Sequence, residues 1–201
     1  HVTVLGAGTM GHGIAQVSAM AGHDVTLRDI EPGIVEDGID SIRSNLEGGV
    51  ERGKVTEAEM DSTLGNITGE TDLPTAVGGA DLVAEAVPED LDLKTTVLTD
   101  AEDVASQETI LATNTSSLSV TELASGLERP GNLIGLHFFN PVHIMSLVEV
   151  VVGERTDDAV REDAIEFVEG IDKTPVVVRD VPGFASSRLG VALGVEGIRM
   201  V

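Results

Sequence analysis

Short apolar runs alternate along the chain with longer stretches whose apolar positions recur at helical spacing. The short runs predict strands at residues 1–5, 25–29, 64–68, 81–87, 109–113, 132–137, 146–152 and 174–178. The longer stretches predict helices at residues 10–21, 33–52, 91–105, 119–127 and 157–170. Because strand and helix alternate, the pattern favours an α/β fold with a doubly wound, mostly parallel sheet.

The alternation ends near the carboxyl terminus. Pro182 and Gly183 interrupt it, and residues 184–201 then carry apolar positions at helical spacing. We therefore expect a first domain over residues 1–181 and the start of a separate all-α unit at residues 182–201. The sequence begins inside an apolar run and ends inside the last predicted helix, so we expect a piece of a longer chain.

A glycine-rich turn follows the first predicted strand. Gly6, Gly8 and Gly11 form a G-x-G-x-x-G pattern, with Thr9 and Met10 inside it, and the pattern opens the first predicted helix. This context is typical of a Rossmann-type turn, in which the helix N-terminus offers free N–H groups to a dinucleotide pyrophosphate. The alternative is a glycine-rich turn that binds no ligand.

Asp29 favours the nucleotide interpretation. It ends the second predicted strand about 20 residues after the glycine pattern, where a carboxylate is expected to bind the ribose hydroxyls. Such a carboxylate would repel a 2′-phosphate, so we predict NAD as the cofactor in preference to NADP. The neighbouring Arg28 is the feature that argues for NADP.

A histidine near the end of the sixth predicted strand is the candidate general base. Oxidation of an alcohol requires a group that accepts its proton, and the ordinary pKa of histidine suits that task. We assign the base to His137 and its orienting partner to Glu149 on the next strand. A structural histidine is the alternative; His143 is a local competitor that we expect to face solvent, and His12 and His23 are expected at surface or turn positions.

Polar residues follow the fifth and sixth predicted strands. Ser116 is a candidate donor to a substrate oxygen, and the alternative role of Ser116 and Ser117 is to cap the helix at 119–127. Asn140 is a candidate for orienting nicotinamide or substrate, and its alternative role is to form the turn before Pro141. The chain contains no H-E-x-x-H, P-loop or G-x-S-x-G pattern, so these three enzyme classes lack support.

Four segments together resemble the L-3-hydroxyacyl-CoA dehydrogenase family. They are residues 6–11 (GAGTMG), 85–89 (EAVPE), 114–118 (NTSSL) and 136–141 (LHFFNP), and the last two are the most specific. The resemblance spans essentially the whole chain. It implies an oxidoreductase that transfers hydride between NAD and C3 of a 3-hydroxyacyl-CoA, in fatty acid β-oxidation or butanoate metabolism.

The resemblance also implies roles for single residues. His137 would be the general base, Glu149 its partner, Ser116 a ligand of the substrate oxygen, and Asn140 a neighbour of nicotinamide and substrate. The residues implied to line the NAD site are Glu89, Lys94, Asn114, Ser116 and Asn140. The residues implied to contact CoA are Asn45, Arg52 and Ser116.

The chain departs from the family in two respects. Many members place an asparagine where this chain has Ser187, which we expect to contact substrate in its stead. The family continues into a helical domain that completes the acyl pocket and forms a homodimer, and only its first helix is expected here. Two other functions stay open: a related dehydrogenase of a sugar acid such as gulonate, and a crystallin-like protein that binds nucleotide without turnover.

Composition limits the partners. The net charge of −23 arises from 35 acidic against 12 basic residues, so we expect neither nucleic acid nor an anionic membrane as a partner. The acids are scattered along the predicted helices, as is typical of proteins adapted to high salt; ordinary acidity is the alternative. The chain has no cysteine, so it has no thiolate ligands for a metal, and we expect no metal cofactor. No apolar run approaches the roughly 20 residues that a membrane span needs, and we expect a cytoplasmic protein.

Overall fold

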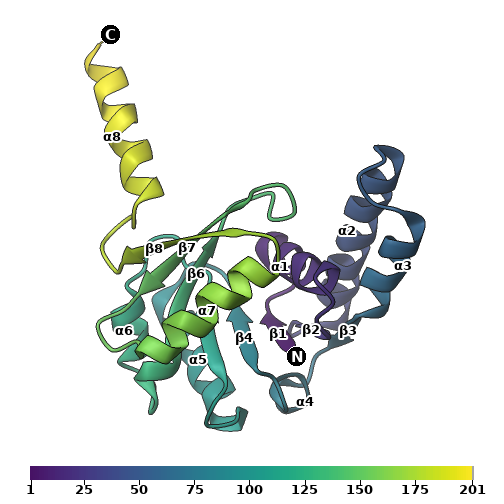
Figure 1. Ribbon diagram of the computed structural model, residues 1–201. Helices are drawn as coiled ribbons and strands as arrows, with labels where there is room; N and C mark the ends of the chain where they lie inside the picture. Colours follow the sequence, from purple (N-terminus) through teal and green to yellow (C-terminus); the bar gives the residue numbers. More distant parts are fainter. Residues whose placement is uncertain (201) are drawn as a thin grey trace.

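An eight-stranded sheet runs through the computed structural model, which describes residues 1–200 (Figure 1). The strands are β1 (Val2–Leu5), β2 (Val25–Arg28), β3 (Ile67–Glu70), β4 (Leu82–Glu85), β5 (Ile110–Thr113), β6 (Leu133–Phe138), β7 (Leu147–Val152) and β8 (Thr174–Arg179). The helices are α1 (Thr9–Met20), α2 (Pro32–Glu51), α3 (Glu57–Gly65), α4 (Leu73–Val77), α5 (Leu91–Val104), α6 (Val120–Ala124), the 3-10 helix η1 (Pro130–Asn132), α7 (Asp158–Gly170) and α8 (Ser186–Arg199).

The strand order is β3-β2-β1-β4-β5-β6-β7-β8, and every pair is parallel except β6 with β7. Successive strands are added on one side of β1 up to β3 and on its other side from β4 onward, so the loops after β1 and β4 diverge and leave a crevice at the carboxyl ends of these strands. This topology confirms the predicted doubly wound, Rossmann-type sheet.

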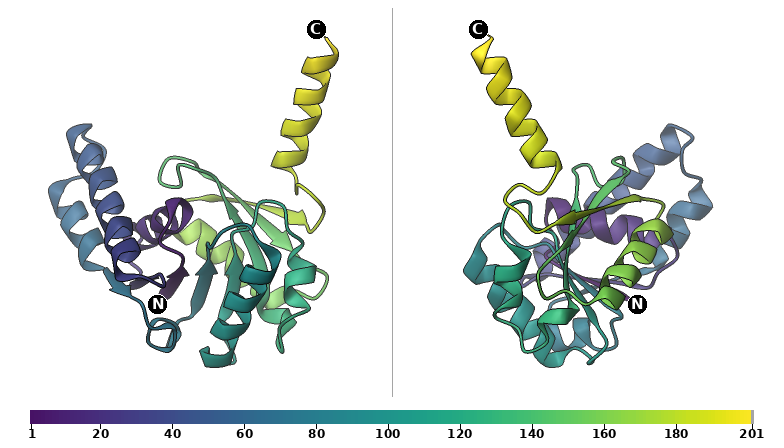
Figure 2. Two further views of the ribbon diagram at one scale, coloured as in Figure 1. Left: turned by 180° about the vertical axis from the view of Figure 1, so that it is seen from behind. Right: turned by 60° about the vertical axis from the view of Figure 1, so that its left-hand side comes forward.

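Helices cover both faces of the sheet and create two apolar clusters (Figures 1 and 2). One cluster joins the sheet to α1, α2 and α7, and the other joins it to α4, α5 and α6. Successive residues of β1 show why a continuous apolar run is needed, since Val4 enters the first cluster and Leu5 the second. Both residues are completely buried.

The predicted strand at residues 64–68 is wrong in its position. Residues up to Gly65 belong to α3, and β3 begins only at Ile67. The reason is a capping box: the Thr56 hydroxyl accepts a hydrogen bond from the Glu59 N–H, while the Glu59 carboxylate accepts one from the Thr56 N–H. These reciprocal bonds start a helix that extends through Gly65.

The short helix α4 was also not expected. Asp72 precedes it and accepts a hydrogen bond from the Thr75 N–H at 3.0 Å, and Pro74 occupies the first turn. Both are ordinary signals of a helix start.

None of the helices described for residues 1–200 combines the length and the apolar character that a membrane span requires.

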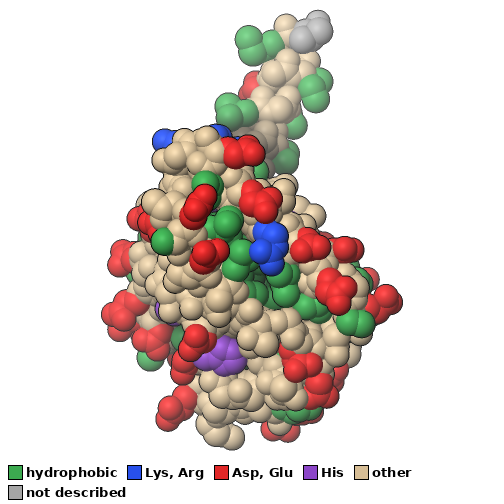
Figure 3. Space-filling view, turned by 90° about the vertical axis from the view of Figure 1, so that its right-hand side faces the viewer, with side chains coloured by type: hydrophobic (Ala, Val, Ile, Leu, Met, Phe, Trp, Pro, Cys, Tyr) green, Lys and Arg blue, Asp and Glu red, His purple; other side chains and the backbone are tan. Residues whose placement is uncertain are grey.

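Helix α8 extends away from the sheet (Figures 1 and 2). It begins two residues later than predicted because Gly183 and Phe184 have positive φ angles of 75° and 44°, which helical backbone cannot adopt. No side chain of α8 is buried, and Leu193, for example, is 73% exposed. Apolar side chains are seen along this helix in Figure 3. The end of the predicted helix, Val201, lies outside the described residues.

Candidate active site

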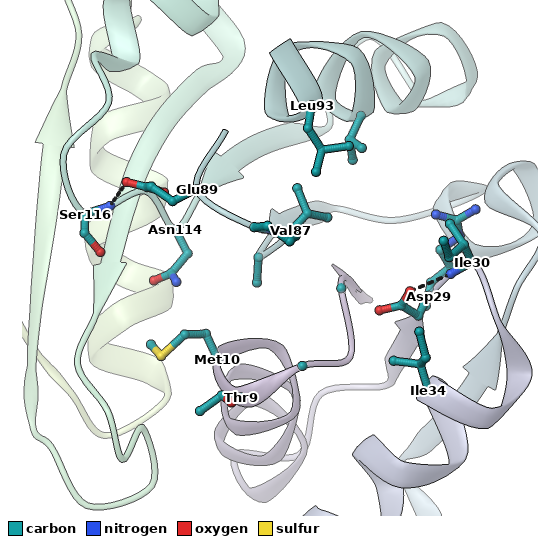
Figure 4. Close-up of a pocket in the computed structure, with 16 residues that line it drawn as sticks. Thr9, Met10, Asp29, Ile30, Ile34, Val87, Glu89, Leu93, Asn114 and Ser116 are labelled. Carbon is teal, nitrogen blue, oxygen red and sulfur yellow. Dashed lines mark hydrogen bonds between the residues drawn. The ribbon is translucent and has the colours of Figure 1, made fainter. Parts of the chain in front are cut away.

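A pocket of about 620 Å³ opens at the carboxyl ends of β1, β2, β4 and β5 (Figure 4). It lies at the reversal of strand order, where α/β sheets bind their ligands. The pocket brings together most of the residues predicted to bind cofactor; Gly11, Lys94 and Asn140 do not line it. The lining residues are Gly6, Gly8, Thr9, Met10, Arg28, Asp29, Ile30, Ile34, Ala86, Val87, Pro88, Glu89, Leu93, Val97, Asn114 and Ser116.

Each glycine of the turn between β1 and α1 has a different role. Gly6 has a φ of 100°, and a Cβ there would lie 2.8 Å from the Ala86 carbonyl oxygen. A Cβ at Gly11 would come within 1.6 Å of the Gly6 carbonyl oxygen, so Gly11 permits close packing of helix on strand. A Cβ at Gly8 would meet no atom within 4 Å, which leaves the backbone open to a ligand.

The first turn of α1 has backbone N–H groups that no side chain caps. Gly8 is its N-cap, so no side chain caps the first turn, and no acidic residue lies in that turn. Helix N-termini of this kind carry free N–H groups and a partial positive charge that attract phosphate. Thr9 and Met10 occupy this first turn and line the pocket.

Asp29 is anchored at the end of β2 beside the glycine turn. Its Oδ2 accepts a hydrogen bond from the Ala7 N–H at 2.8 Å. Its Oδ1 accepts one from the Ile30 N–H at 2.7 Å, which is drawn in Figure 4. The carboxylate is therefore held at the pocket edge. The neighbouring Arg28 also lines the pocket, but its Nε–H is directed to the Thr71 carbonyl at 3.0 Å.

Glu89 organises the opposite wall of the pocket. Its Oε1 accepts hydrogen bonds from the Thr115 hydroxyl at 2.7 Å, from the N–H groups of Ser116 and Ser117 at 2.8 and 3.0 Å, and from the Ser117 hydroxyl at 3.2 Å. Burial tends to raise the pKa of Glu89, but these hydrogen bonds and the nearby Lys94 charge hold it below its ordinary value. Ser116 and Ser117 do not cap α6, because Ser119 does so.

Asn114 connects the pocket to the next strand, while Lys94 lies behind the pocket wall. The Asn114 Oδ1 accepts a hydrogen bond from the Phe138 N–H at 2.9 Å. The Lys94 ammonium is 1% exposed and lies 2.7 Å from Glu85, 3.1 Å from the Val87 carbonyl oxygen and 3.6 Å from Glu89. Lys94 thus differs from the expected lining position, since it supports the loop that forms the wall.

His137 and Glu149 form a buried pair on adjacent antiparallel strands. They are direct partners in the β6–β7 register, and His137 Nδ1 lies 2.7 Å from Glu149 Oε2. Their exposed fractions are 6% and 1%. Because the carboxylate is an acceptor, Nδ1 carries the hydrogen and Nε2 is left as the proton-accepting nitrogen. The rings of Phe139 and Phe184 lie 4.6 and 5.7 Å from the imidazole.

Glu149 has further partners at the start of α8. Its Oε1 accepts hydrogen bonds from the N–H groups of Ala185 at 3.0 Å and Ser186 at 2.8 Å, and its Oε2 accepts one from the Ser186 hydroxyl at 3.0 Å. Sequence reasoning missed Ser186 and selected Ser187, which is half-buried next to it. The only signal was the position of both serines directly after the Pro182–Phe184 turn.

Two of the residues implied to contact CoA, Asn45 and Arg52, lie on α2 and at its end. Asn45 donates a hydrogen bond to Gln16 on α1 at 3.1 Å, and Arg52 is exposed. His143 is partly exposed, and its pKa is lowered by burial, then by the charges of His12, Lys173 and Arg52. A small group of basic side chains therefore gathers here on an acidic protein.

Asn140 is exposed in the loop after β6. The residue precedes Pro141, as in the turn-forming alternative, and it follows His137 closely enough to share the same edge of the sheet. Within residues 1–200, no three or more acidic or histidine side chains are grouped so as to hold a metal ion.

Comparison with known proteins identifies a family and several relatives of this chain. The family model described as the NAD binding domain of 3-hydroxyacyl-CoA dehydrogenase matches residues 1–181. A 3-hydroxybutyryl-CoA dehydrogenase of Clostridioides difficile is 41% identical over 191 residues, which are 94% of this chain and 66% of that protein. The fatty acid oxidation complex subunit alpha of Idiomarina loihiensis is 44% identical over 186 residues, which are 92% of this chain and 26% of that protein.

A solved structure agrees with these relatives. FadB2 of M. tuberculosis matches with a TM-score of 0.95 and 40% identity, covering all of this chain and 70% of that one. The chain thus spans only part of the length of its relatives, about a quarter of the oxidation complex subunit. The family and the cofactor predicted from the sequence are confirmed by the match to an NAD binding domain.

Proposed function

The chain belongs to the 3-hydroxyacyl-CoA dehydrogenase family, and we propose that the enzyme containing it uses NAD to oxidise the 3-hydroxyl of an acyl-CoA thioester. The observation that supports this most strongly is the buried His137–Glu149 pair, with its 2.7 Å hydrogen bond at the same edge of the sheet as the pocket. Nucleotide binding alone requires neither residue, which argues against a purely structural, crystallin-like role.

The pocket residues fit NAD. Gly8 leaves room for the pyrophosphate, Thr9 and Met10 offer N–H groups to it, and Gly6 and Gly11 shape the turn. Asp29 would accept hydrogen bonds from the adenosine ribose hydroxyls, because its carboxylate lies at the pocket edge.

The nicotinamide half of NAD would lie toward Glu89, Asn114, Ser116 and Asn140, with Lys94 supporting the wall. Bound NAD supplies the hydride acceptor. The chain's own residues then have to hold the alcohol and move its proton.

His137 would accept the hydroxyl proton at Nε2 as hydride departs. Glu149 keeps the ring in the tautomer that presents Nε2 and stabilises the imidazolium that forms. Ser116 would donate a hydrogen bond to the reacting oxygen, and Asn140 would orient substrate against nicotinamide. In the reverse direction, protonated His137 returns the proton to the oxygen of the 3-keto group.

The CoA moiety would lie along α2, where Asn45 and the basic Arg52 face an anionic ligand, and Ser187 would contact the acyl part. Residues 1–181 would form the NAD-binding domain and residues 182–201 the start of a helical substrate domain, which would also pair two subunits. The exposed apolar side chains of α8 support this division, because they lack packing partners among residues 1–200. The cytoplasmic location stays a prediction.

Turnover by the full-length protein tests the proposal. We expect loss of NADH absorbance when acetoacetyl-CoA is added, and oxidation of 3-hydroxybutyryl-CoA with NAD in the reverse assay. Gulonate serves as the comparison substrate and should give no NADH. Turnover of gulonate without turnover of either acyl-CoA would contradict the proposal and favour a sugar acid dehydrogenase.

A further inference from the structure

The carboxylate of Glu149 is shared between the catalytic histidine and the segment that leads into α8. Four donors reach its two oxygens: His137 Nδ1, the N–H groups of Ala185 and Ser186, and the Ser186 hydroxyl. Two of these donors, His137 and the Ser186 hydroxyl, use the same oxygen, Oε2, at 2.7 and 3.0 Å. They therefore compete for the negative charge of one carboxylate oxygen.

The segment before α8 is fixed in the place that makes these bonds. Phe184 is 2% exposed and packs in the core, with its ring 5.7 Å from the His137 ring. Its N–H bonds to the Val181 carbonyl at 2.8 Å, and the Arg188 N–H bonds to the Gly183 carbonyl at 3.0 Å. This turn directs the first N–H groups of α8 at Glu149.

We infer that Ser186 is a positioning residue for the catalytic base: its hydroxyl orients the Glu149 carboxylate and limits how strongly that carboxylate retains a proton on His137. The inference rests on the proposed function, because it assumes that His137 is the base. It also connects the position of α8 to the base, since displacement of α8 would withdraw three of the four donors.

The charges around the pair support the direction of this effect. In residues 1–200, Glu149 is the charged side chain that hydrogen-bonds His137, and the aromatic rings of Phe139 and Phe184 flank the imidazole. Burial tends to raise the pKa of Glu149, but the hydrogen bonds from His137, Ser186 and Ala185 hold it below its ordinary value. Without the Ser186 hydroxyl, the carboxylate becomes more basic and holds the His137 proton more firmly.

A pH profile of the full-length enzyme tests the inference. Ser186→Ala should move the acidic limb of kcat/KM for 3-hydroxybutyryl-CoA oxidation to higher pH by roughly 0.3 to 1 unit, because one hydrogen bond to a charged group is lost. Ser186→Thr keeps a hydroxyl and should restore the wild-type profile. Ser125→Ala is the matched control, since that hydroxyl donates to the Glu122 carbonyl at the end of α6, and it should leave the profile unchanged.

Two outcomes would overturn the inference. One is a Ser186→Ala profile that superimposes on the wild-type profile; the other is a lower rate at every pH without a shift, which indicates a merely structural role. If the wild-type protein does not turn over 3-hydroxybutyryl-CoA, the proposed function fails. In that case the His137 ring titration, followed by ¹⁵N NMR and assigned with His137→Gln, still tests the inference: its midpoint should rise in Ser186→Ala, and an unchanged midpoint contradicts it.

Discussion

The pocket and the His137–Glu149 pair are built in different ways. The pocket is lined by residues of the turns that follow β1, β2, β4 and β5, and its glycines face a carbonyl oxygen or open space. The pair depends instead on the antiparallel register of β6 and β7, and on donors that arrive from Ala185 and Ser186. The residues that line the pocket all lie between Gly6 and Ser116, whereas the pair receives hydrogen bonds from the segment between β8 and α8.

Loss of the base should have the largest effect and should separate the two regions. In the full-length protein, His137→Gln is expected to lower kcat by about 10²–10⁴-fold, the usual contribution of a positioned acid–base group. NADH affinity should stay unchanged because His137 does not line the pocket. Near-normal turnover in His137→Gln, together with inactivity of His143→Gln, would show that the base is misassigned.

Substitution of Gly8 by alanine should weaken cofactor binding without unfolding the protein. Gly8→Ala places a Cβ in the space that the pyrophosphate would use, so we expect NADH to bind about tenfold more weakly, or about 1.4 kcal/mol. The melting temperature should be unchanged, since no protein atom lies within 4 Å of that Cβ. Gly65→Ala, equally unhindered but at the end of α3, is the control. Wild-type affinity in Gly8→Ala would place the pyrophosphate elsewhere.

Cofactor choice should depend on Asp29 within the same pocket. NADH is expected to bind at least tenfold more tightly than NADPH, because the carboxylate repels a 2′-phosphate. Nicotinamide fluorescence can report both affinities, as the chain contains no tryptophan or tyrosine. Arg28→Ala should leave the ratio unchanged. Equal affinities, or a preference for NADPH, would instead identify Arg28 as a phosphate-binding residue.

The smallest effect concerns the acidic surface that surrounds both regions, part of which is seen in Figure 3. Since 35 acidic residues repel one another at low ionic strength, salt should stabilise the fold by screening exposed charges and strengthening apolar burial. We expect the melting temperature to rise by several degrees from dilute buffer to molar KCl, as measured by calorimetry. A melting temperature that does not change with KCl would indicate ordinary acidity and not adaptation to high salt.

Much of the fold could be predicted from local patterns. The glycine turn, Asp29 and the alternation of apolar runs are short-range features, and they suffice to predict the Rossmann-type sheet. The capping box at Thr56 and Glu59 is equally local, but apolar periodicity alone does not reveal it, and helix α3 was therefore missed. By contrast, β7 runs antiparallel to β6 because the loop between them is too short for a parallel crossover, and the apolar pattern of either strand alone does not reveal this.

The candidate site shows the same limit. His137 and Glu149 could be proposed from residue type and order, but their contact depends on the β6–β7 register. For Lys94 the prediction from residue type differs from the structure, because this charged side chain, expected to face the cofactor, is buried against Glu85. Ser186 could not be distinguished from Ser187, since only the backbone turn at Gly183 and Phe184 decides which serine reaches Glu149.

Titration of residues 1–201 alone with NADH, set beside the full-length protein, tests the separation of the two regions most directly. We predict affinities that agree within about threefold, while the shorter chain reduces acetoacetyl-CoA very slowly because it cannot hold the acyl group against nicotinamide, a contribution of roughly 7–11 kcal/mol. Affinity that falls tenfold or more, in a chain that remains folded, would contradict the account, because the cofactor pocket would then depend on structure beyond the sheet domain.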